Sequence, residues 1–193
     1  MTTLAPTLSN RLFPRLHPLA RDLMLIVGGS LLVALLAQVQ IVLPFTPVPI
    51  TGQTLGVLLA GALLGSKRGA AALALYLAEG TLGLPFFAGG SGGPSHLLGA
   101  TGGYLLGFVA AAYTTGWLCE RGLERRWQTA IAPFVAGSLV IYACGAAWLA
   151  AFVGAQKALA LGVLPFLAGD ALKALLAAGL LPGAWRLAKS RNA

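Results

Sequence analysis

The stretch Leu23–Ser66, LMLIVGGSLLVALLAQVQIVLPFTPVPITGQTLGVLLAGALLGS, runs for 44 residues without an Asp, Glu, Lys or Arg. A second uncharged run of 40 residues extends from Gly80 to Cys119. A surface that faces water carries charges every few residues, whereas a charged side chain at the centre of a bilayer costs roughly 2.5–3.5 kcal/mol on insertion scales. The two runs therefore predict an integral membrane protein that crosses the bilayer several times.

The composition agrees with a membrane protein. Hydrophobic residues make up 58% of the chain and charged residues only 9%, whereas a soluble chain is about 25% charged. A chain of 193 residues accommodates about six spans of ~20 residues with short connections. We expect one all-α membrane domain over residues 1–193, with a lead-in over 1–19, a compact bundle of six transmembrane helices over 20–188 and a tail over 189–193.

The basic residues indicate the orientation of this bundle. Eleven of the 13 gather in four clusters between or beyond the apolar runs: Arg11, Arg15 and Arg21; Lys67 and Arg68; Arg121, Arg125 and Arg126; Arg186, Lys189 and Arg191. In a soluble protein a net charge of +8 would indicate nucleic acid binding, but clusters at span ends mark the cytoplasmic side. We exclude nucleic acid as a partner and expect both termini on the cytoplasmic side of a bacterial inner membrane.

The clusters alternate with weakly charged connections, and this alternation sets the expected spans. They are Ala20–Leu43, Gln53–Gly65, Gly69–Leu84, Thr101–Cys119, Gln128–Ala155 and Pro165–Leu187. The second and third, of 13 and 16 residues, reach only about 20–24 Å at 1.5 Å per residue. That is short of a hydrocarbon core of ~30 Å.

Because these two spans are short, the connections Pro44–Gly52 and Pro85–Ala100 must dip below the outer surface. Non-helical backbone at that depth is tolerated only where it is buried in protein or lines a cavity. The first connection is stiffened by its prolines, and the second is rich in glycine. We favour two outward-facing loops that cap a pocket; simple helix connections are the alternative.

Asp170 and Lys173 are the most informative charged pair. They lie three residues apart in an otherwise apolar helix and hence on one face. Ionised groups inside a membrane usually face a site or each other. The functional interpretation is polar recognition of a ligand, and the structural alternative is an ion pair that fixes helix packing.

Other polar groups are expected near the same face. Gln53 and Tyr104 stand at the outer starts of their helices. Glu79 is a further intramembrane charge, which either lines the same cavity or pairs with Lys173.

Catalytic and metal-binding patterns are absent from the sequence. It contains no P-loop, no HExxH and no multi-histidine pattern. The two cysteines, Cys119 and Cys144, form neither a metal nor a convincing disulfide pattern. We expect a protein that is not an enzyme and has no catalytic residue, metal or cofactor.

Five motifs in series resemble the BioY family, the biotin-specific substrate-binding subunits of energy-coupling factor (ECF) transporters. They are PVPITGQT (Pro47–Thr54), LAGALLG (Leu59–Gly65) with Gly69, GLPFFAGG (Gly83–Gly90), GATGGYL (Gly99–Leu105) and GDALK (Gly169–Lys173). The match covers about Leu31 to Leu176. Glu79 departs from the pattern, because the family is usually apolar there.

The resemblance implies high-affinity binding of biotin from outside and uptake together with a membrane coupling subunit and two ATPase subunits. ATP is then used by those partners and is not bound by this chain. Biotin offers a ureido group, an apolar thioether ring and a carboxylate. The expected substrate-binding residues are polar, aromatic and glycine positions: Asp170, Lys173, Gln53, Tyr104, Phe86, Phe87, Gly89 and Gly90.

The resemblance also implies a docking contact. The first helix of the family carries small residues at every fourth position against the coupling subunit, and Ser30 and Ala34 keep that spacing. Two points stay open in the sequence. One is whether the chain acts as a self-sufficient carrier of biotin or another vitamin without the ATPase module, and the other is whether it forms a homo-oligomer.

Overall fold

The computed structural model describes residues 3–190, apart from the side chains of residues 11, 12 and 187–190. The outermost parts of the expected lead-in and tail, residues 1–2 and 191–193, lie outside this description. The chain is mostly helical. Its elements are α1 (Leu4–Leu12), α2 (Pro18–Ala37), β1 (Gln40–Ile41), β2 (Ile50–Thr51), α3 (Gln53–Leu64), α4 (Ser66–Thr81), η1 (Ala88–Gly90), α5 (Ser95–Leu98), α6 (Gly102–Glu120), η2 (Leu123–Arg125), α7 (Ala132–Val153), α8 (Ala155–Gly162) and α9 (Leu164–Ser190).

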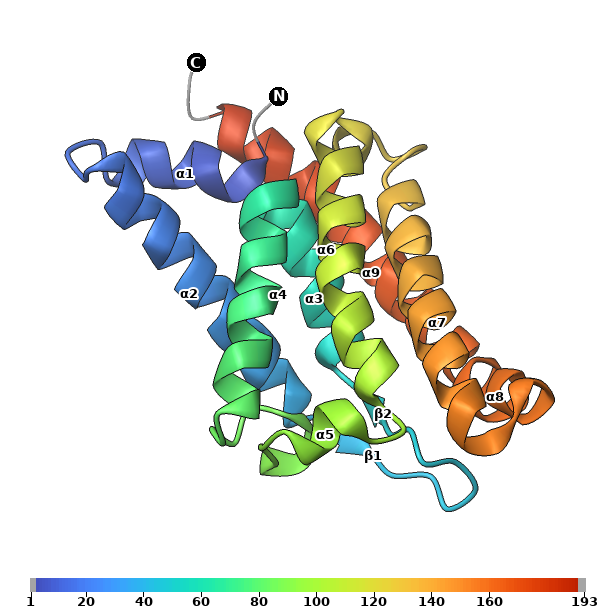
Figure 1. The fold of residues 1–193 in the computed structure, drawn as a ribbon. Coiled ribbons are helices and arrows are strands. Elements are labelled where there is room, and N and C mark those ends of the chain that lie inside the picture. Colours follow the sequence, from blue (N-terminus) through green and yellow to red (C-terminus); the bar gives the residue numbers. More distant parts are fainter. Residues whose placement is uncertain (1–2, 191–193) are drawn as a thin grey trace.

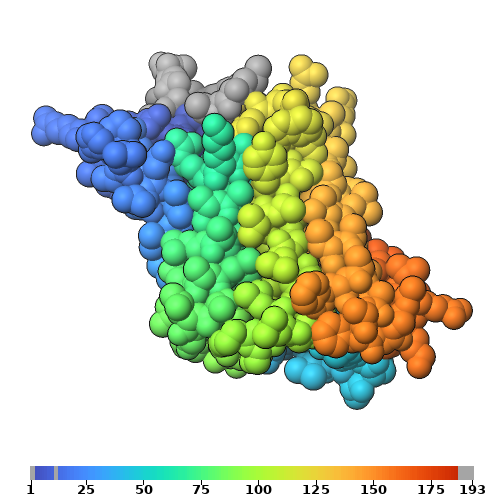
Figure 2. Space-filling view, viewed as in Figure 1, coloured from blue at the N-terminus to red at the C-terminus, as the bar shows by residue number. Residues whose placement is uncertain are grey.

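The six longest helices form a bundle (Figure 1): α2, α3, α4, α6, α7 and α9. Helix α1 lies across one end, beside the last turns of α9, whereas β1, β2 and α5 lie at the other end. Figure 2 shows α4, α6 and α7 packed side by side on one face of the bundle.

Two expectations from the sequence need correction. The first span ends at Ala37 instead of Leu43, because Gln40–Ile41 pairs in antiparallel register with Ile50–Thr51. The fold is therefore not purely α-helical. The connection between the expected spans Gln128–Ala155 and Pro165–Leu187 contains helix α8, which Gly154 separates from α7 at a positive φ of 85°.

The bundle has the apolar helices of an integral membrane protein. Within the described residues, Pro18–Ala37, Ala132–Val153 and Leu164–Arg186 are each long and apolar enough to cross a bilayer. Large apolar side chains also cover the outside of the bundle, as Leu35 (69% exposed) and Leu180 (70% exposed) illustrate. Such a surface suits lipid and is unfavourable in water.

Helices α3 and α4 are short, as the sequence predicts. Their 12 and 16 residues correspond to about 18 and 24 Å. They pack on α6 through glycines at backbone contact: a Cβ at Gly61 would lie 2.5 Å from the Ala112 carbonyl oxygen, and one at Gly116 would lie 2.4 Å from Gly65 C. Small residues allow this approach where lipid gives helices no hydrophobic drive to associate.

A carboxylate from α6 caps α4 at the α1 end of the bundle. Glu120 Oε1 accepts hydrogen bonds from the Ser66 backbone N–H (2.8 Å) and from Ser66 Oγ (3.0 Å). The negative charge lies at the helix N-terminus, where the backbone dipoles favour an anion. The tight Gly65 turn between α3 and α4 is held by this contact.

A second carboxyl group at this end is buried with only partial compensation. Glu124 is 1% exposed, its ion-pair partner is Arg125 Nε at 3.5 Å from Oε1, and the Arg125 guanidinium lies over the Trp185 ring, 4.3 Å from its centroid. Burial raises the pKa of the Glu124 carboxyl above its usual value, against smaller opposing effects of a backbone hydrogen bond and of Arg125.

Glu124→Gln should therefore stabilise the protein at neutral and higher pH. As pH rises, a carboxyl whose pKa is raised on folding loses its proton in the unfolded chain before it does so in the folded one. The wild type therefore loses stability as pH rises above about 4.5, the ordinary pKa of a Glu carboxyl. Thermal unfolding in detergent from pH 4.5 to 8 should show an advantage for the variant that grows with pH. Glu120→Gln is the matched control and should destabilise, because Glu120 caps α4. An advantage of Glu124→Gln that is reversed at pH 8 would show that the ion pair with Arg125 outweighs burial.

Candidate substrate-binding site

A cavity of about 340 Å³ lies at the end of the bundle opposite α1. Residues of the loops before α3 and before α6 line it, together with residues of α3, α6, α7 and α9. Its lining is mainly apolar with a few polar groups: Gln40, Val42, Thr46, Pro47, Val48, Pro49, Thr51, Gln53, Thr54, Phe87, Ala88, Ser91, His96, Thr101, Tyr104, Leu105, Phe108, Ile141, Tyr142, Phe166, Asp170 and Lys173. An apolar pocket with a few convergent polar groups is typical of a small-molecule site.

Asp170 on α9 is the centre of the first polar group. It is 6% exposed and accepts hydrogen bonds from Thr54 Oγ1 (2.9 Å) on α3, Tyr142 Oη (2.6 Å) on α7 and Lys173 Nζ (2.7 Å) on its own helix. Three helices are thus joined at one carboxylate. A charge in this apolar surrounding persists because each charged group has partners.

Lys173 uses all of its hydrogen-bonding capacity within the protein. An ammonium group has three N–H donors, and the Lys173 Nζ donates to Asp170 Oδ1 (2.7 Å), Thr54 Oγ1 (2.8 Å) and the Thr51 carbonyl oxygen (2.8 Å). Thr51 belongs to β2. The ion pair therefore also holds the β1–β2 hairpin against α9.

A second hydrogen-bond chain links the cavity wall to the glycine-rich loop. Gln53 Nε2 donates to Tyr76 Oη (2.6 Å), and Tyr76 Oη donates to the Phe86 carbonyl oxygen (3.1 Å). Tyr76 is fully buried. The start of the loop is thereby fixed on α4.

The glycine-rich loop is folded and anchored. The ring of Phe87 is buried over Gly80, where a Cβ would lie 2.3 Å from the ring, and the Gly93 N–H donates to the Gly80 carbonyl oxygen (2.7 Å). Gly89 has a φ of 69° and lies against the side chain of Gln40. The two loops therefore contact each other above the cavity.

Further polar residues of the lining come from the segments before α3 and α6. They are Gln40, Thr46, Ser91, His96 and Thr101. The His96 ring packs edge-on against Phe87 with 5.7 Å between ring centroids. The ionisable side chains among the lining residues are Asp170, Lys173, two tyrosines and His96.

The structure brings five of the eight predicted substrate residues to the cavity: Gln53, Phe87, Tyr104, Asp170 and Lys173. The other three, Phe86, Gly89 and Gly90, are not in its lining. Tyr104 contributes its ring, since its hydroxyl donates to the Gly162 carbonyl oxygen (2.7 Å). Glu79 lies apart from Lys173 and accepts a hydrogen bond from Ser30 Oγ instead.

The two residues expected to dock a partner are packed within the chain. Ser30 is fully buried and Ala34 is 6% exposed, and Ser30 is bonded to Glu79 on α4. The side of α2 that is open carries Val27, Leu31 and Leu35.

Sequence reasoning did not find Tyr76, Tyr142 and His96. Tyr76 and Tyr142 lie in apolar helices where an aromatic residue is ordinary core, and no local pattern distinguishes them. His96 is a single histidine, which carries no motif. Among the described residues, no group of three His, Cys, Asp or Glu side chains is placed to hold a metal ion.

Comparison with known proteins places this geometry in a family. The family model described as "BioY family" matches residues 5–190. The "Probable biotin transporter BioY" of Pyrococcus horikoshii is 46% identical over 138 residues, which are 72% of this chain and 81% of that protein. The "Biotin transporter BioY" of Rhizobium etli is 40% identical over 168 residues, 82% of this chain and 89% of that protein.

The fold also matches a solved structure. The crystal structure of the S-component for biotin from an ECF-type ABC transporter superposes with a TM-score of 0.78 at 26% identity, covering 86% of this chain and 92% of that one. The family match extends over nearly the whole chain, including both cavity loops and the Asp170–Lys173 pair. This chain belongs to the BioY family.

Proposed function

We propose that this chain binds biotin in the cavity and serves as the substrate-specific subunit for biotin uptake by an ECF-type transporter. Its relatives are named biotin transporters, and the similar solved structure is the S-component for biotin of such a transporter. The observation that carries the proposal is the Asp170–Lys173 network in the wall of an otherwise apolar cavity. The chain acts in transport and not as an enzyme.

The network suits the ureido group of biotin. A carboxylate offers about four lone-pair positions, and the protein occupies three of those on Asp170: two at Oδ1 and one at Oδ2. The remaining position on Oδ2 accepts a ureido N–H. The ureido carbonyl then takes an N–H of Lys173 in exchange for one of its protein acceptors.

Replacing Asp170 or Lys173 should weaken biotin binding by roughly 2–5 kcal/mol, because a charged hydrogen bond is lost and its buried partner is left unpaired. Calorimetric titration of Asp170→Asn, Lys173→Gln and the double variant, each monodisperse, measures this loss. Lys157→Gln, an exposed charge on α8, is the control and should bind as the wild type does. If the double variant binds biotin normally, the pair is structural only.

We propose His96 as the group that receives the biotin carboxylate. Lys173 is assigned to the ureido carbonyl in this proposal, whereas His96 is a further ionisable side chain of the lining and comes from the glycine-rich loop. The apolar ring and chain of biotin then lie between Lys173 and His96, along Phe87, Tyr104 and Phe166.

Comparison of biotin with biotinamide, in which a carboxamide replaces the carboxylate, tests this orientation. His96→Ala should weaken biotin binding roughly ten- to hundredfold, the value of a hydrogen bond to a charged group, and leave biotinamide nearly unchanged. His96→Arg should restore the preference for the acid. An equal loss for both ligands would mean that His96 only supports the loop.

The coupling subunit and the ATPase subunits supply the energy for release into the cell in this proposal. A self-sufficient carrier is the alternative, and biotin uptake by cells with and without the ATPase module separates the two.

We propose that the six bundle helices all span the membrane, with α1 and the end of α9 in the cytoplasm. The orientation is supported by the basic residues, which gather at the α1 end. The cavity and its two capping loops then face outward.

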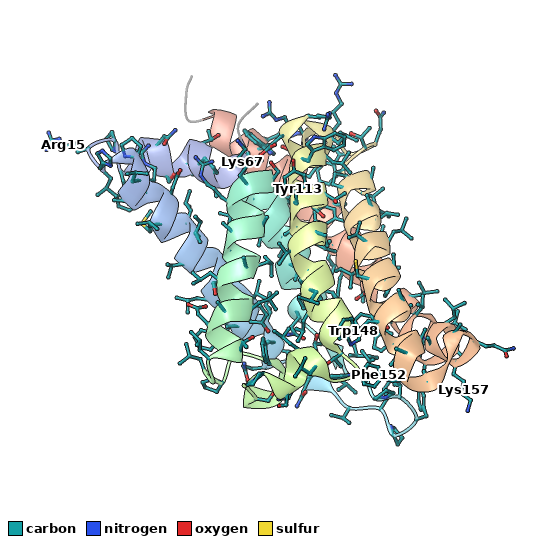
Figure 3. All side chains as sticks on the ribbon, in the orientation of Figure 1. Arg15, Lys67, Tyr113, Trp148, Phe152 and Lys157 are labelled. Atoms are coloured by element: carbon teal, nitrogen blue, oxygen red, sulfur yellow. The ribbon has the colours of Figure 1, made fainter. Side chains whose placement is uncertain are left out.

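Single cysteines at Lys67 and Lys157 should report the two sides. Both lysines are exposed and lie at opposite ends of the bundle (Figure 3). In intact cells a membrane-impermeant maleimide should label Lys157→Cys, whereas Lys67→Cys should be labelled only after permeabilisation. The wild-type chain measures the background from Cys119 and Cys144. Labelling of Lys67→Cys in intact cells would show that the orientation is the opposite of the one proposed.

A further inference from the structure

Helix α1 and the turn after it project from the bundle at its basic end. Figure 1 shows α1 running across the ends of the bundle helices and the turn after it extending beyond the start of α2. One side of α1 is packed: Leu4 is buried with Trp185 of α9, against Leu63 of α3. The projecting part, residues 13–17, has no such cover.

This projecting turn combines apolar and basic exposure. Phe13 is 45% exposed and Leu16 is 39% exposed, and Arg15 between them is exposed at the outermost point of the turn (Figure 3). Lys67 is a second exposed cation at the same end of the bundle. Within the described part of the chain, neither Arg15 nor Lys67 has an ion-pair partner.

The turn is held in shape by its neighbours. The Arg21 guanidinium donates to the carbonyl oxygens of Phe13 (3.0 Å) and Leu16 (3.1 Å) and to Asn10 Oδ1. The nearby acid, Asp22, is paired with Arg68 at 2.8 Å. The exposed charge of residues 13–17 is therefore positive. Because Arg21 already fixes the backbone of this turn, a ligand does not have to order it on binding.

We propose that α1 and residues 13–17 form an anchor for anionic lipid headgroups. The turn directly precedes Pro18, where the first membrane-crossing helix begins, so its side chains lie at the level of the headgroups. Apolar side chains in that layer bury in the acyl boundary while neighbouring cations attract lipid phosphates. Phe13 and Leu16 insert, and Arg15 and Lys67 bind the phosphates of phosphatidylglycerol or a similar lipid.

Native mass spectrometry of the full chain, released from nanodiscs of equimolar phosphatidylcholine and phosphatidylglycerol, tests the anchor. The wild type should retain phosphatidylglycerol preferentially. Arg15→Gln should lower that preference roughly fivefold, the effect of about one basic residue at a charged membrane surface, and Arg15→Gln with Lys67→Gln should abolish it. Phe13→Ser with Leu16→Ser should reduce total lipid retention. Both leaflets of a nanodisc contain the lipid, so the result does not depend on orientation.

Lys157→Gln is the matched control, because it removes an exposed cation at the opposite end of the bundle and should leave lipid retention unchanged. Retention that is the same in the Arg15 and Lys67 variants as in the wild type would overturn the anchor. So would displacement of the lipid by inorganic phosphate, which would indicate a free-anion site. Loss of copurifying transporter subunits in Arg15→Gln with unchanged lipid retention would assign the surface to a protein partner.

Discussion

A buried charged group must find its partners within the protein, and this constraint organises the end of the molecule opposite α1. Asp170 and Lys173 are one such pair, and their bonds to Thr54, Tyr142 and Thr51 reach α3, α7 and the β1–β2 hairpin. The carboxylate needs these neighbours because burial leaves it only 6% exposed. A single ion pair therefore positions three helices and a loop, and these elements line the cavity together with α6 and the glycine-rich loop.

The short helices α3 and α4 provide the space for that enclosure. The chain that connects them to α2 and α6 packs on the bundle through Thr46, Val48 and Phe87, which are buried, whereas Phe45, Leu84 and Leu98 stay exposed. Its backbone polar groups are satisfied there: the Gly93 N–H by Gly80, the Phe86 carbonyl by Tyr76, and the Thr51 carbonyl by Lys173. Loops that dip into a membrane protein are stable only with such partners. The cavity is thus a consequence of helix length and backbone hydrogen bonding together.

The sequence predicted the membrane class, the positions of the bundle helices and the Asp170–Lys173 pair, because exclusion of charge and helical spacing are local properties. It did not predict the β1–β2 hairpin or α8, whose formation depends on tertiary contacts such as the Thr46 hydroxyl with the Leu161 carbonyl oxygen (2.8 Å). At Ser30 and Ala34 the structure shows an internal contact between α2 and α4. Small residues at every fourth position fit an internal helix contact and an external one equally well, so the spacing alone does not distinguish the two.

The three hydrogen bonds of Lys173 Nζ within the protein constrain how a ligand binds there. Every N–H of Lys173 is already used, so a ligand oxygen that takes one must replace a protein acceptor. If the ligand takes the place of the Thr51 carbonyl as acceptor, β2 is released from α9. If it takes the place of the Thr54 hydroxyl, the hairpin stays attached and the contact with α3 is lost instead. The Gln40 side chain of the same hairpin lies against Gly89, so movement of the hairpin also reaches the glycine-rich loop. In the first case, binding at the polar wall therefore moves the β1–β2 hairpin and, through Gln40, the glycine-rich loop.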